Sequence, residues 1–360
     1  MSPTAVHRII RTSCSRSRRR EIEVAIAQAL NFKIPEIIRI HDTRATIATV
    51  NTLQTRRMPR RLRRVMEYWQ ALVLGIIEGI TEYLPVSSTG HLLVAQRLMG
   101  LDTGADGAKA AADTYAICIQ GGAILAVLGL YYNRVMQMIR GVLGRDAEGL
   151  RLAICILVGF LPAAMIGVIF NDLIEEKLFG LWPVVFAWVV GGLMILAAVW
   201  WRKRKPAPHG GLDLVEMTWK MALVVGFLQC VAMWPGTSRS LMTIVGGLLV
   251  GLSLRSAVEY SFLLGVLTLT AATAKKAVWG VNSMDGYDAW FGGARLMWDS
   301  YGPGSLTVGL VAATVSAALA VKWLVSYLQS HGLAVFGWYR IALGVSIGAL
   351  VLTGVFDAQA

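Results

Sequence analysis

The sequence predicts an all-α polytopic membrane protein, with about six transmembrane helices and two re-entrant helical hairpins that form inverted repeats. Hydrophobic residues make up 56% of the 360 residues, and the mean hydropathy of +0.58 is well above the range of soluble domains. Apolar sequence runs with few interruptions from about residue 72 to residue 356. Two polar motifs interrupt it where ionisable side chains are costly, so both motifs are expected to be functional.

The basic character of the chain belongs to its first 65 residues. The whole chain has a net charge of +12, but residues 1–64 alone have a net charge of +11, so the remainder is nearly neutral. The overall pI of 9.8 therefore does not indicate a nucleic-acid partner, and we expect none. No stretch of residues 1–65 is apolar enough to span a bilayer or to form the core of a signal peptide. We expect a poorly ordered extension over residues 1–65, with Met66 as the true start of a membrane domain covering 66–360.

Six stretches are long and apolar enough to cross a membrane. They lie at about 112–132, 152–170, 182–201, 254–279, 304–326 and 334–356. Two further apolar stretches, residues 67–100 and 213–251, are each broken in the middle by proline and small hydroxyl residues. Proline interrupts a helix, and non-helical backbone at membrane depth is tolerated only where it is buried or lines a cavity. Both stretches are therefore predicted to be re-entrant helix–loop–helix hairpins.

The two hairpins have similar sequences at their centres. Pro85 and Pro235 lie 150 residues apart, and Ser88 and Ser238 follow them at matching positions. Each hairpin is followed by a predicted spanning helix. An internal duplication with broken helices that meet near the membrane midplane is typical of secondary transporters. The pattern therefore leaves a transport function open beside an enzymatic one.

Loop charge predicts the orientation of the chain. Residues 133–151 contain four arginines, and residues 202–205 are all basic, so both segments are expected to be cytoplasmic. The segment between them sets three acidic residues against Lys177 and fits the outside: Asp172, Glu175 and Glu176. The first hairpin then enters from the outer face and the second from the cytoplasmic face, which makes the repeats inverted.

Glu78 and Glu82, in the first motif, are spaced to share one face of a helix. Two carboxylates this close can bind a hard divalent cation such as Mg²⁺ or Ca²⁺, with water and phosphate oxygens completing the coordination. The alternative is a solvated turn at a helix end, which the preceding apolar run of residues 72–77 disfavours.

Ser87, Ser88, Thr89 and His91 follow the proline of the first motif. His91 is a candidate general acid, general base or nucleophile, and a hydrogen-bonded structural histidine is the alternative. The three hydroxyl residues are candidates for substrate binding and are equally suited to cap the returning helix. The two roles are compatible, because a helix N-terminus presents amide N–H groups to an anion.

Arg239 is the central residue of the second motif. A guanidinium presents a planar fork of donors to phosphate oxygens and keeps its charge. Hydroxyl donors surround it at the start of another helix: Ser238, Ser240 and Thr243. The alternative, an arginine that extends to the membrane interface, is disfavoured by apolar sequence on both sides. Glu259 and Arg340 are also charged within predicted spans, and the sequence leaves their partners open.

The two motifs resemble those of the undecaprenyl pyrophosphate phosphatase family, the bacitracin-resistance membrane phosphatases. The family's glutamate-rich signature is matched over residues 78–91, and its Pro-Gly-x-Ser-Arg-Ser-x-x-Thr signature over residues 235–243. Weaker similarity extends the resemblance over about residues 67–356. Leu267 stands where the family pattern leads us to expect a proline, and leucine in place of that proline would straighten the helix. The N-terminal extension has no family counterpart.

The resemblance implies a metal-dependent hydrolase of the bacterial inner membrane with its active site facing the periplasm. The enzyme would hydrolyse undecaprenyl pyrophosphate to undecaprenyl phosphate and inorganic phosphate, which recycles the lipid carrier of peptidoglycan synthesis and confers bacitracin resistance. Glu78 and Glu82 would bind the metal or serve acid–base roles. Ser88 and His91 would be the nucleophile and its proton partner, and Arg239 with Ser238 would hold the pyrophosphate.

Two other functions are weighed against this one. A flippase for the lipid carrier would bind the same head group with Arg239 and need no nucleophile, so phosphate release in detergent would distinguish it from an enzyme. A structural scaffold would leave the buried charges unexplained. The expected partners are the lipid substrate and membrane lipids. The nucleophile (Ser88, His91 or water), the metal and the oligomeric state stay open, with a homodimer as one alternative.

Overall fold

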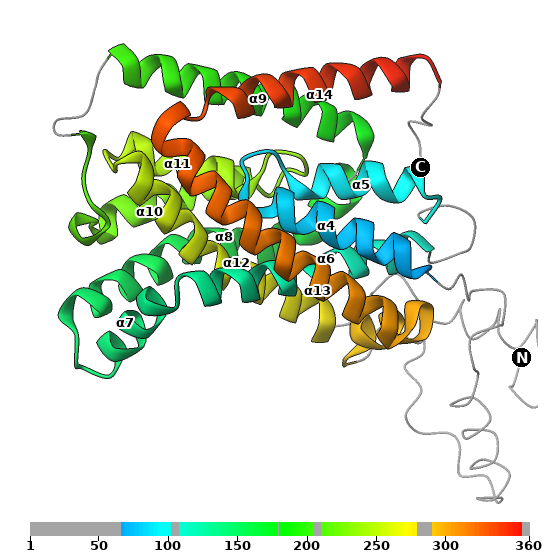
Figure 1. The fold of residues 1–360 in the computed structure, drawn as a ribbon, viewed down its shortest axis with the longest axis horizontal. Helices are drawn as coiled ribbons and strands as arrows, with labels where there is room; N and C mark the ends of the chain where they lie inside the picture. Colours follow the sequence, from blue (N-terminus) through cyan, green and yellow to red (C-terminus); the bar gives the residue numbers. More distant parts are fainter. Residues whose placement is uncertain (1–65, 102–107, 179, 205–209, 279–289, 355–360) are drawn as a thin grey trace, which may run out of the picture. The chain divides into compact units, whose positions relative to one another are not determined.

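The fold is described from a computed structural model over five segments (Figure 1): residues 66–101, 108–178, 180–204, 210–278 and 290–354. In these segments the chain is almost entirely helical, and its only β-structure is an isolated bridge between Leu212 and Leu252. The predicted extension, residues 1–65, lies outside the described residues. Its boundary at Met66 therefore stays a prediction.

The described part contains eleven α-helices and one short 3-10 helix. In chain order these are α4 (Tyr68–Tyr83), α5 (Ser88–Leu98), α6 (Ala108–Leu130), α7 (Tyr132–Val142), α8 (Ala147–Leu178), α9 (Leu181–Arg204), η3 (Leu214–Glu216), α10 (Trp219–Val231), α11 (Arg239–Leu249), α12 (Leu254–Val278), α13 (Gly292–His331) and α14 (Ala334–Leu352).

Six of these helices are long and apolar enough to cross a membrane: α6, α8, α9, α12, α13 and α14. This confirms the six predicted spans. The predicted stretch 304–326 is shorter than α13, which has 40 residues and joins two helices across a break at Gly302, where φ is 74°. Pro303 follows the break, and proline suits the first turn of a helix. The predicted span therefore matches the second of the two joined helices.

Both predicted hairpins are helix–loop–helix elements. Residues 84–87 connect α4 to α5, and residues 232–238 connect α10 to α11, so each loop contains one of the two prolines. Figure 1 draws α4 and α5 toward one end of the described part and α10 and α11 toward the other. The two elements meet where the hydroxyl of Ser240 donates to the carbonyl oxygen of Leu84 at 2.8 Å.

The repeat extends over the whole of both hairpins. Three pairs of helix-end residues have the same sequence separation of 151 residues: Glu67 and Thr218, Ser87 and Ser238, Gly100 and Gly251. The first two pairs are helix N-caps, and the glycines end the returning helices with positive φ. The predicted register was wrong by one residue: Ser238 matches Ser87 rather than Ser88, because the second loop has one more residue between its proline and the cap.

Each hairpin packs on a long helix of the other repeat. α4 packs most extensively on α13, and α10 packs on α8. Glycines bring the backbones together at both contacts: a Cβ on Gly75 would overlap the carbonyl oxygen of Gly309, and a Cβ on Gly226 would overlap that of Gly159. Small residues at such contacts are how membrane helices pack closely. Because each hairpin packs on a helix of the other repeat, the two repeats are interlocked.

α9 and α14 pack along each other and cover the loops from one side (Figure 1). α9 contributes the buried Trp188, and α14 contributes the buried Arg340. The other span residue whose partner the sequence left open, Glu259, forms an ion pair with Arg134 at 2.7 Å. α12 runs unbroken past Leu267, as the missing proline leads one to expect.

Replacing Gly75 with alanine is expected to destabilise the protein, because the new methyl group would overlap the backbone of α13. Overpacking of this kind costs about 2 kcal/mol. Thermal unfolding of purified Gly75→Ala in detergent should therefore show a lower midpoint than the unsubstituted protein. Gly129→Ala is the matched control, since nothing lies within 4 Å of its added Cβ. Equal midpoints for the two variants would contradict the contact described between α4 and α13.

Candidate functional site

Side chains from four helices hold the first loop. A side chain donates to each of its carbonyl oxygens: Ser240 of α11 to Leu84 (2.8 Å), Arg340 of α14 to Pro85 (3.3 Å), Trp188 of α9 to Val86 (3.0 Å) and His91 of α5 to Ser87 (2.7 Å). A lipid bilayer offers no water to such carbonyls. These donors therefore let the backbone leave the helical conformation at membrane depth.

Arg340 also connects the first loop to the second. Its side chain is fully buried, and it donates to the carbonyl oxygen of Gly236 at 2.9 Å and to that of Ala187 at 2.8 Å. A Cβ on Gly191 would overlap the guanidinium, so this glycine provides the space that the arginine occupies. The arginine therefore fixes the relative position of the two loops, and its partners are backbone carbonyls rather than a carboxylate.

The cap residues Ser87 and Ser238 share an uncommon backbone conformation, with φ of 75° and 79°. Among the described non-glycine residues only Phe291 also has a positive φ. Such a conformation costs about 1–3 kcal/mol and persists only where the surroundings hold it, as at functional sites. Both serines cap their helices, accepting from the backbone N–H of Gly90 and Leu241. The N-termini of α5 and α11, which favour anions, therefore lie at the junction of the loops.

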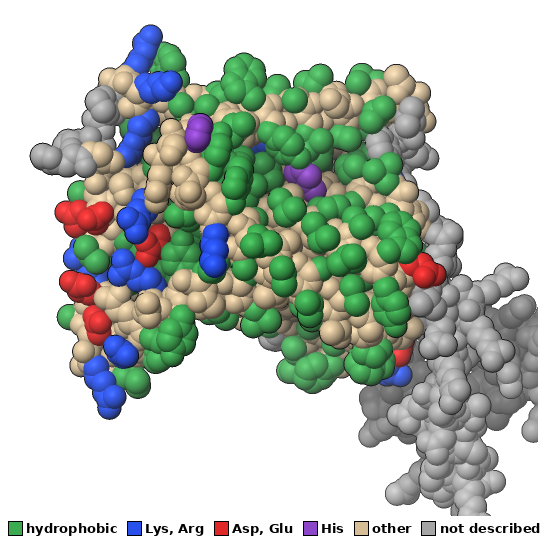
Figure 2. Space-filling model, viewed as in Figure 1, with side chains coloured by type: hydrophobic (Ala, Val, Ile, Leu, Met, Phe, Trp, Pro, Cys, Tyr) green, Lys and Arg blue, Asp and Glu red, His purple; other side chains and the backbone are tan. Residues whose placement is uncertain are grey.

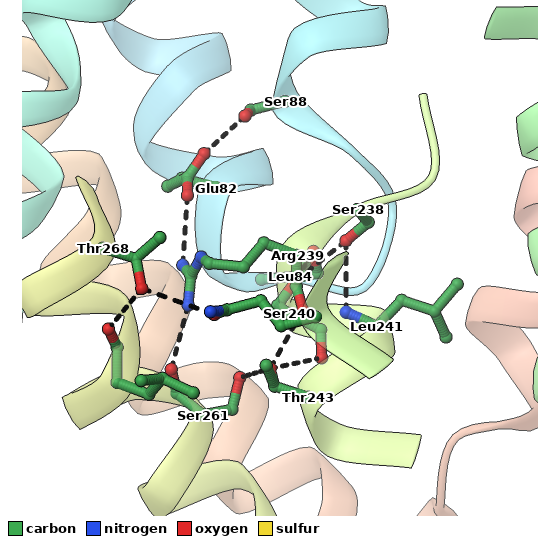
Figure 3. Close-up of polar contacts among 12 residues, drawn as sticks. Glu82, Leu84, Ser88, Ser238, Arg239, Ser240, Leu241, Thr243, Ser261 and Thr268 are labelled. Carbon is green, nitrogen blue, oxygen red and sulfur yellow. Dashed lines mark hydrogen bonds and ion pairs between the residues drawn. The ribbon is translucent and has the colours of Figure 1, made fainter. Parts of the chain in front are cut away.

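Glu82 joins the two polar motifs (Figure 3). One of its carboxylate oxygens accepts a hydrogen bond from Nη2 of Arg239 at 3.1 Å, and the other accepts one from the hydroxyl of Ser88. The side chains of Glu82 and Arg239 are only 6% and 10% exposed. A hydroxyl that donates to a buried carboxylate is the arrangement of a nucleophile and its general base. The structure thus brings together three of the predicted catalytic residues.

Arg239 is held from several sides. Its Nη1 donates to the carbonyl oxygen of Ser261 at 2.9 Å, and its guanidinium lies 5.5 Å from the ring centroid of Tyr83. A Cβ on Gly265 would overlap the guanidinium, so α12 can approach it only with glycine at this position. The Nε of Arg239 has no hydrogen-bond partner among the described residues. The side chain is therefore fixed in place and still has a donor for a ligand.

Glu78 lies one helical turn before Glu82 and is fully buried. Neither of its carboxylate oxygens has a hydrogen-bond partner among the described residues. A buried carboxylate without a partner is costly, so Glu78 either carries a proton or binds a cation or a ligand. The described residues contain no group of three or more His, Cys, Asp or Glu that could hold a metal ion. Two carboxylates completed by water and phosphate oxygens fit the coordination habits of Mg²⁺.

His91 is bound to the loop and to α14 rather than to Ser88. Its Nδ1 lies 2.7 Å from the carbonyl oxygen of Ser87, and its Nε2 lies 2.8 Å from the hydroxyl of Tyr339. A carbonyl can only accept, so in the neutral ring Nδ1 donates and Nε2 accepts from Tyr339. The proton acceptor of Ser88 in this structure is Glu82. A catalytic role of His91 stays a prediction.

The hydroxyl residues predicted to bind substrate make different contacts. Ser240 donates to the first loop, Thr243 shares a hydrogen bond with Ser261 of α12 at 2.6 Å, and Ser238 caps α11. All three are buried, and these bonds hold α11 against its neighbours. Thr89 is exposed at the start of α5 and is not part of this group. Contact of these hydroxyls with substrate stays a prediction.

Gln229 of α10 is a buried polar residue that neither sequence motif contains. This residue is 2% exposed, and its Nε2 has no hydrogen-bond partner among the described residues. Its Oε1 accepts from Thr268 of α12 at 3.4 Å, and Gly265, on which a Cβ would overlap the guanidinium of Arg239, precedes Thr268 on the same helix. In the register defined by the helix caps, Gln229 occupies the position of Glu78. The register of the two hairpins is therefore the signal in the sequence that points to Gln229, a polar residue in an apolar helix.

Together the fold and the site define a class: a polytopic membrane protein in which two re-entrant loops enclose a buried Glu–Arg–Ser group suited to phosphate chemistry. Comparison with known families places the chain within this class. The chain belongs to the family described as Bacitracin resistance protein BacA, which matches residues 71–346. The resemblance that the two motifs predicted is confirmed.

Curated bacterial relatives cover most of the chain. It is 41% identical over 282 residues to "Undecaprenyl-diphosphatase" of Sorangium cellulosum, which covers 78% of this chain and 86% of that protein. It is 41% identical over 292 residues to "Undecaprenyl-diphosphatase 2" of Rhodospirillum rubrum, with 81% and 97% covered. The "Undecaprenyl-diphosphatase" of Acinetobacter baumannii is 40% identical over 281 residues, with 78% and 94% covered.

Substituting Gly265 should impair the site without removing any of its functional groups. In Gly265→Ala the added methyl group would displace the guanidinium of Arg239. A displacement of about 1 Å can lower activity by about 100-fold, so we expect a loss of this order in phosphate release from a lipid pyrophosphate. Gly129→Ala is again the control and should retain activity. An active Gly265→Ala variant would show that the position of Arg239 in this structure is not the one that function requires.

Proposed function

We propose that this protein hydrolyses undecaprenyl pyrophosphate to undecaprenyl phosphate and inorganic phosphate. The observation that carries the proposal is the buried series of hydrogen bonds from Ser88 and Arg239 to Glu82, which joins the two motifs. The relatives named undecaprenyl-diphosphatase support the choice of substrate. Turnover of this lipid would recycle the carrier of peptidoglycan synthesis and confer bacitracin resistance.

Arg239 binds and stabilises the pyrophosphate in this proposal. Negative charge gathers on the phosphate oxygens during phosphoryl transfer, so positioning and charge stabilisation supply most of the catalysis. The guanidinium is held in advance by Glu82 and by the carbonyl of Ser261, so little reorganisation is needed when substrate binds. The N-termini of α5 and α11 add favourable dipoles at the same junction.

Ser88 is proposed as the nucleophile and Glu82 as its general base. The Ser88 oxygen attacks the terminal phosphorus while its proton passes to Glu82. The bond from that phosphorus to the bridging oxygen breaks, and undecaprenyl phosphate leaves with the electron pair and takes the proton. A water molecule then gives a proton to Glu82 and attacks the phosphoserine, which releases inorganic phosphate and returns the proton to Ser88.

A divalent cation, Mg²⁺ or Ca²⁺, is proposed as the cofactor. Glu78 is the principal ligand in this proposal, because both oxygens of Glu82 already accept hydrogen bonds whereas those of Glu78 have no such partner among the described residues. Phosphate oxygens and water would supply the remaining ligands. A bound cation would offset the negative charge of the pyrophosphate.

The site is proposed to face the periplasm of a bacterial inner membrane. On the face drawn in Figure 2, Lys and Arg side chains gather mainly at one end, the end at which Figure 1 places α7. Basic residues mark the cytoplasmic side of membrane proteins. In Figure 1 the α4–α5 hairpin lies toward the opposite end, so it would enter from the periplasm and bring Glu82 and Ser88 with it.

Purified protein in detergent should release phosphate from undecaprenyl pyrophosphate when Mg²⁺ or Ca²⁺ is present and stop when EDTA is added. Glu82→Gln should lower kcat by about 10²- to 10⁴-fold, the usual contribution of a general base. Ser88→Ala should be similarly inactive, because it removes the attacking oxygen. Glu78→Gln should raise the metal concentration needed for half-maximal release. The assay is phosphate release at several metal concentrations.

Thr270→Ala is the control for Ser88→Ala, because Thr270 is an exposed hydroxyl residue of α12. An active Ser88→Ala variant would favour water as the nucleophile and exclude the phosphoserine step. Activity in EDTA would exclude the metal. If no variant and no condition released phosphate while the lipid still bound, the flippase would replace the enzyme as the better interpretation.

The orientation is tested with single cysteines in intact cells. A membrane-impermeant maleimide should label Lys109→Cys, at the start of α6, and should label Lys203→Cys, at the end of α9, only after the cells are opened. Both lysines are exposed, so accessibility differs only by the side of the membrane. The unsubstituted protein, with its native cysteines, gives the background. Labelling of Lys203→Cys from outside would reverse the proposed orientation.

A further inference from the structure

An apolar groove runs along the outer side of the contact between α4 and α13. Its volume is about 1010 Å³. Residues at every fourth position of α4 and at its C-cap form one wall, and α13 forms the other: Leu72, Ile76, Ile80 and the cap residue Leu84 on one side, Val315 and Leu319 of α13 on the other. In Figure 2, hydrophobic side chains cover the region of these two helices. The groove therefore opens toward the lipid phase.

Glycines determine the shape of this groove. Gly75 and Gly79 let α4 approach α13 until a Cβ on either would overlap atoms of Gly309 or Ser316. The two backbones therefore touch along the floor of the groove. The larger side chains on either side, such as Ile80 and Val315, stand away from this floor and remain exposed. The groove is therefore preformed by close helix packing and is not a gap left by loose packing.

One end of the groove reaches the first loop, next to the polar site. Leu84, the last α4-side residue of the groove, is the first residue of the loop, and its carbonyl oxygen accepts the hydroxyl of Ser240. Glu82 lies two residues earlier, and its carboxylate contacts Arg239 and Ser88. Groove and site thus lie on opposite sides of the last turn of α4, and both border the loop that follows it. A molecule with a polar head and an apolar tail could occupy both.

We propose that this groove binds the prenyl chain of the lipid pyrophosphate whose head group occupies the site. The proposal rests on the proposed function and extends it to the part of the substrate that does not react. If the head group lies at the depth of the loops, the first isoprene units of the tail need apolar surroundings next to the loops. The groove begins at Leu84, the first residue of the first loop. Two other cavities are less suitable, because Arg255 and Glu259 line one, and Arg134 and Glu148 the other.

Filling the groove should impair long substrates selectively. Val315→Trp places a bulky side chain in the groove. Val315 is exposed, so the substitution does not disturb the core. We expect KM for undecaprenyl pyrophosphate to rise about tenfold, the effect of losing contact with roughly two methylene groups. Both kcat and KM for dimethylallyl pyrophosphate, which has the same diphosphate but one isoprene unit, should stay unchanged.

Val168→Trp is the matched control, because Val168 is also an exposed valine of a long apolar helix, α8, and does not line the groove. It should leave the kinetics of both substrates unchanged. Equal losses on the long and the short substrate in Val315→Trp would mean that the site itself was disturbed and would overturn the proposal. So would unchanged kinetics on the long substrate, or the same loss in the control variant.

A second measurement does not depend on catalysis. A photo-crosslinking amino acid at position 315, compared with the same probe at position 168, should capture undecaprenyl phosphate from mixed vesicles that also contain phosphatidylglycerol. Selective capture at position 315 supports the groove even if the protein hydrolyses nothing, which would refute only the phosphatase. Capture of phosphatidylglycerol alone at position 315 would show that the groove is occupied by bulk lipid and would overturn the proposal.

Discussion

The centre of this fold depends on one constraint: backbone carbonyls that leave a helix inside a membrane must find hydrogen-bond donors within the protein. The first loop meets it with four side chains from four helices, of which Arg340 also binds the second loop. Proline breaks the helices, and the donors stabilise the break. Because the donors come from α5, α9, α11 and α14, the loop can adopt its conformation only when these helices have packed around it.

The same junction holds groups that are unfavourable for stability. Glu82 and Arg239 are both desolvated, and a buried ion pair often gains less from attraction than it loses in hydration. Glu78 and Gln229 keep polar atoms without partners among the described residues, and Ser87 and Ser238 hold strained backbone. These unfavourable terms are concentrated in one place, where a charged substrate and a cation would offset them. That distribution is expected of a site preorganised for an anion.

The helix α4 separates two environments along its length. One side carries Glu78 and Glu82 into the polar junction, and the other carries Leu72, Ile76 and Ile80 into the groove. Residues three to four apart share one side of a helix, so each side continues along the whole of α4. Both sides end at the first loop, where Pro85 stops the helix. A lipid pyrophosphate has the same division between a polar head and an apolar tail. In the proposed complex, α4 therefore presents one side to the head group and the other side to the tail.

The sequence by itself determined the six spans, the two hairpins and the shared face of Glu78 and Glu82. Spans follow from the apolar length a bilayer requires, and the shared face follows from helical periodicity, which relates near neighbours only. The ion pair between Glu82 and Arg239, the contact of His91 with Tyr339 and the place of Gln229 were decided by tertiary structure. These contacts join residues far apart in the chain. They depend on how the helices pack, for which glycines at the α4–α13 and α8–α10 contacts are needed, and no local pattern specifies which helices will meet.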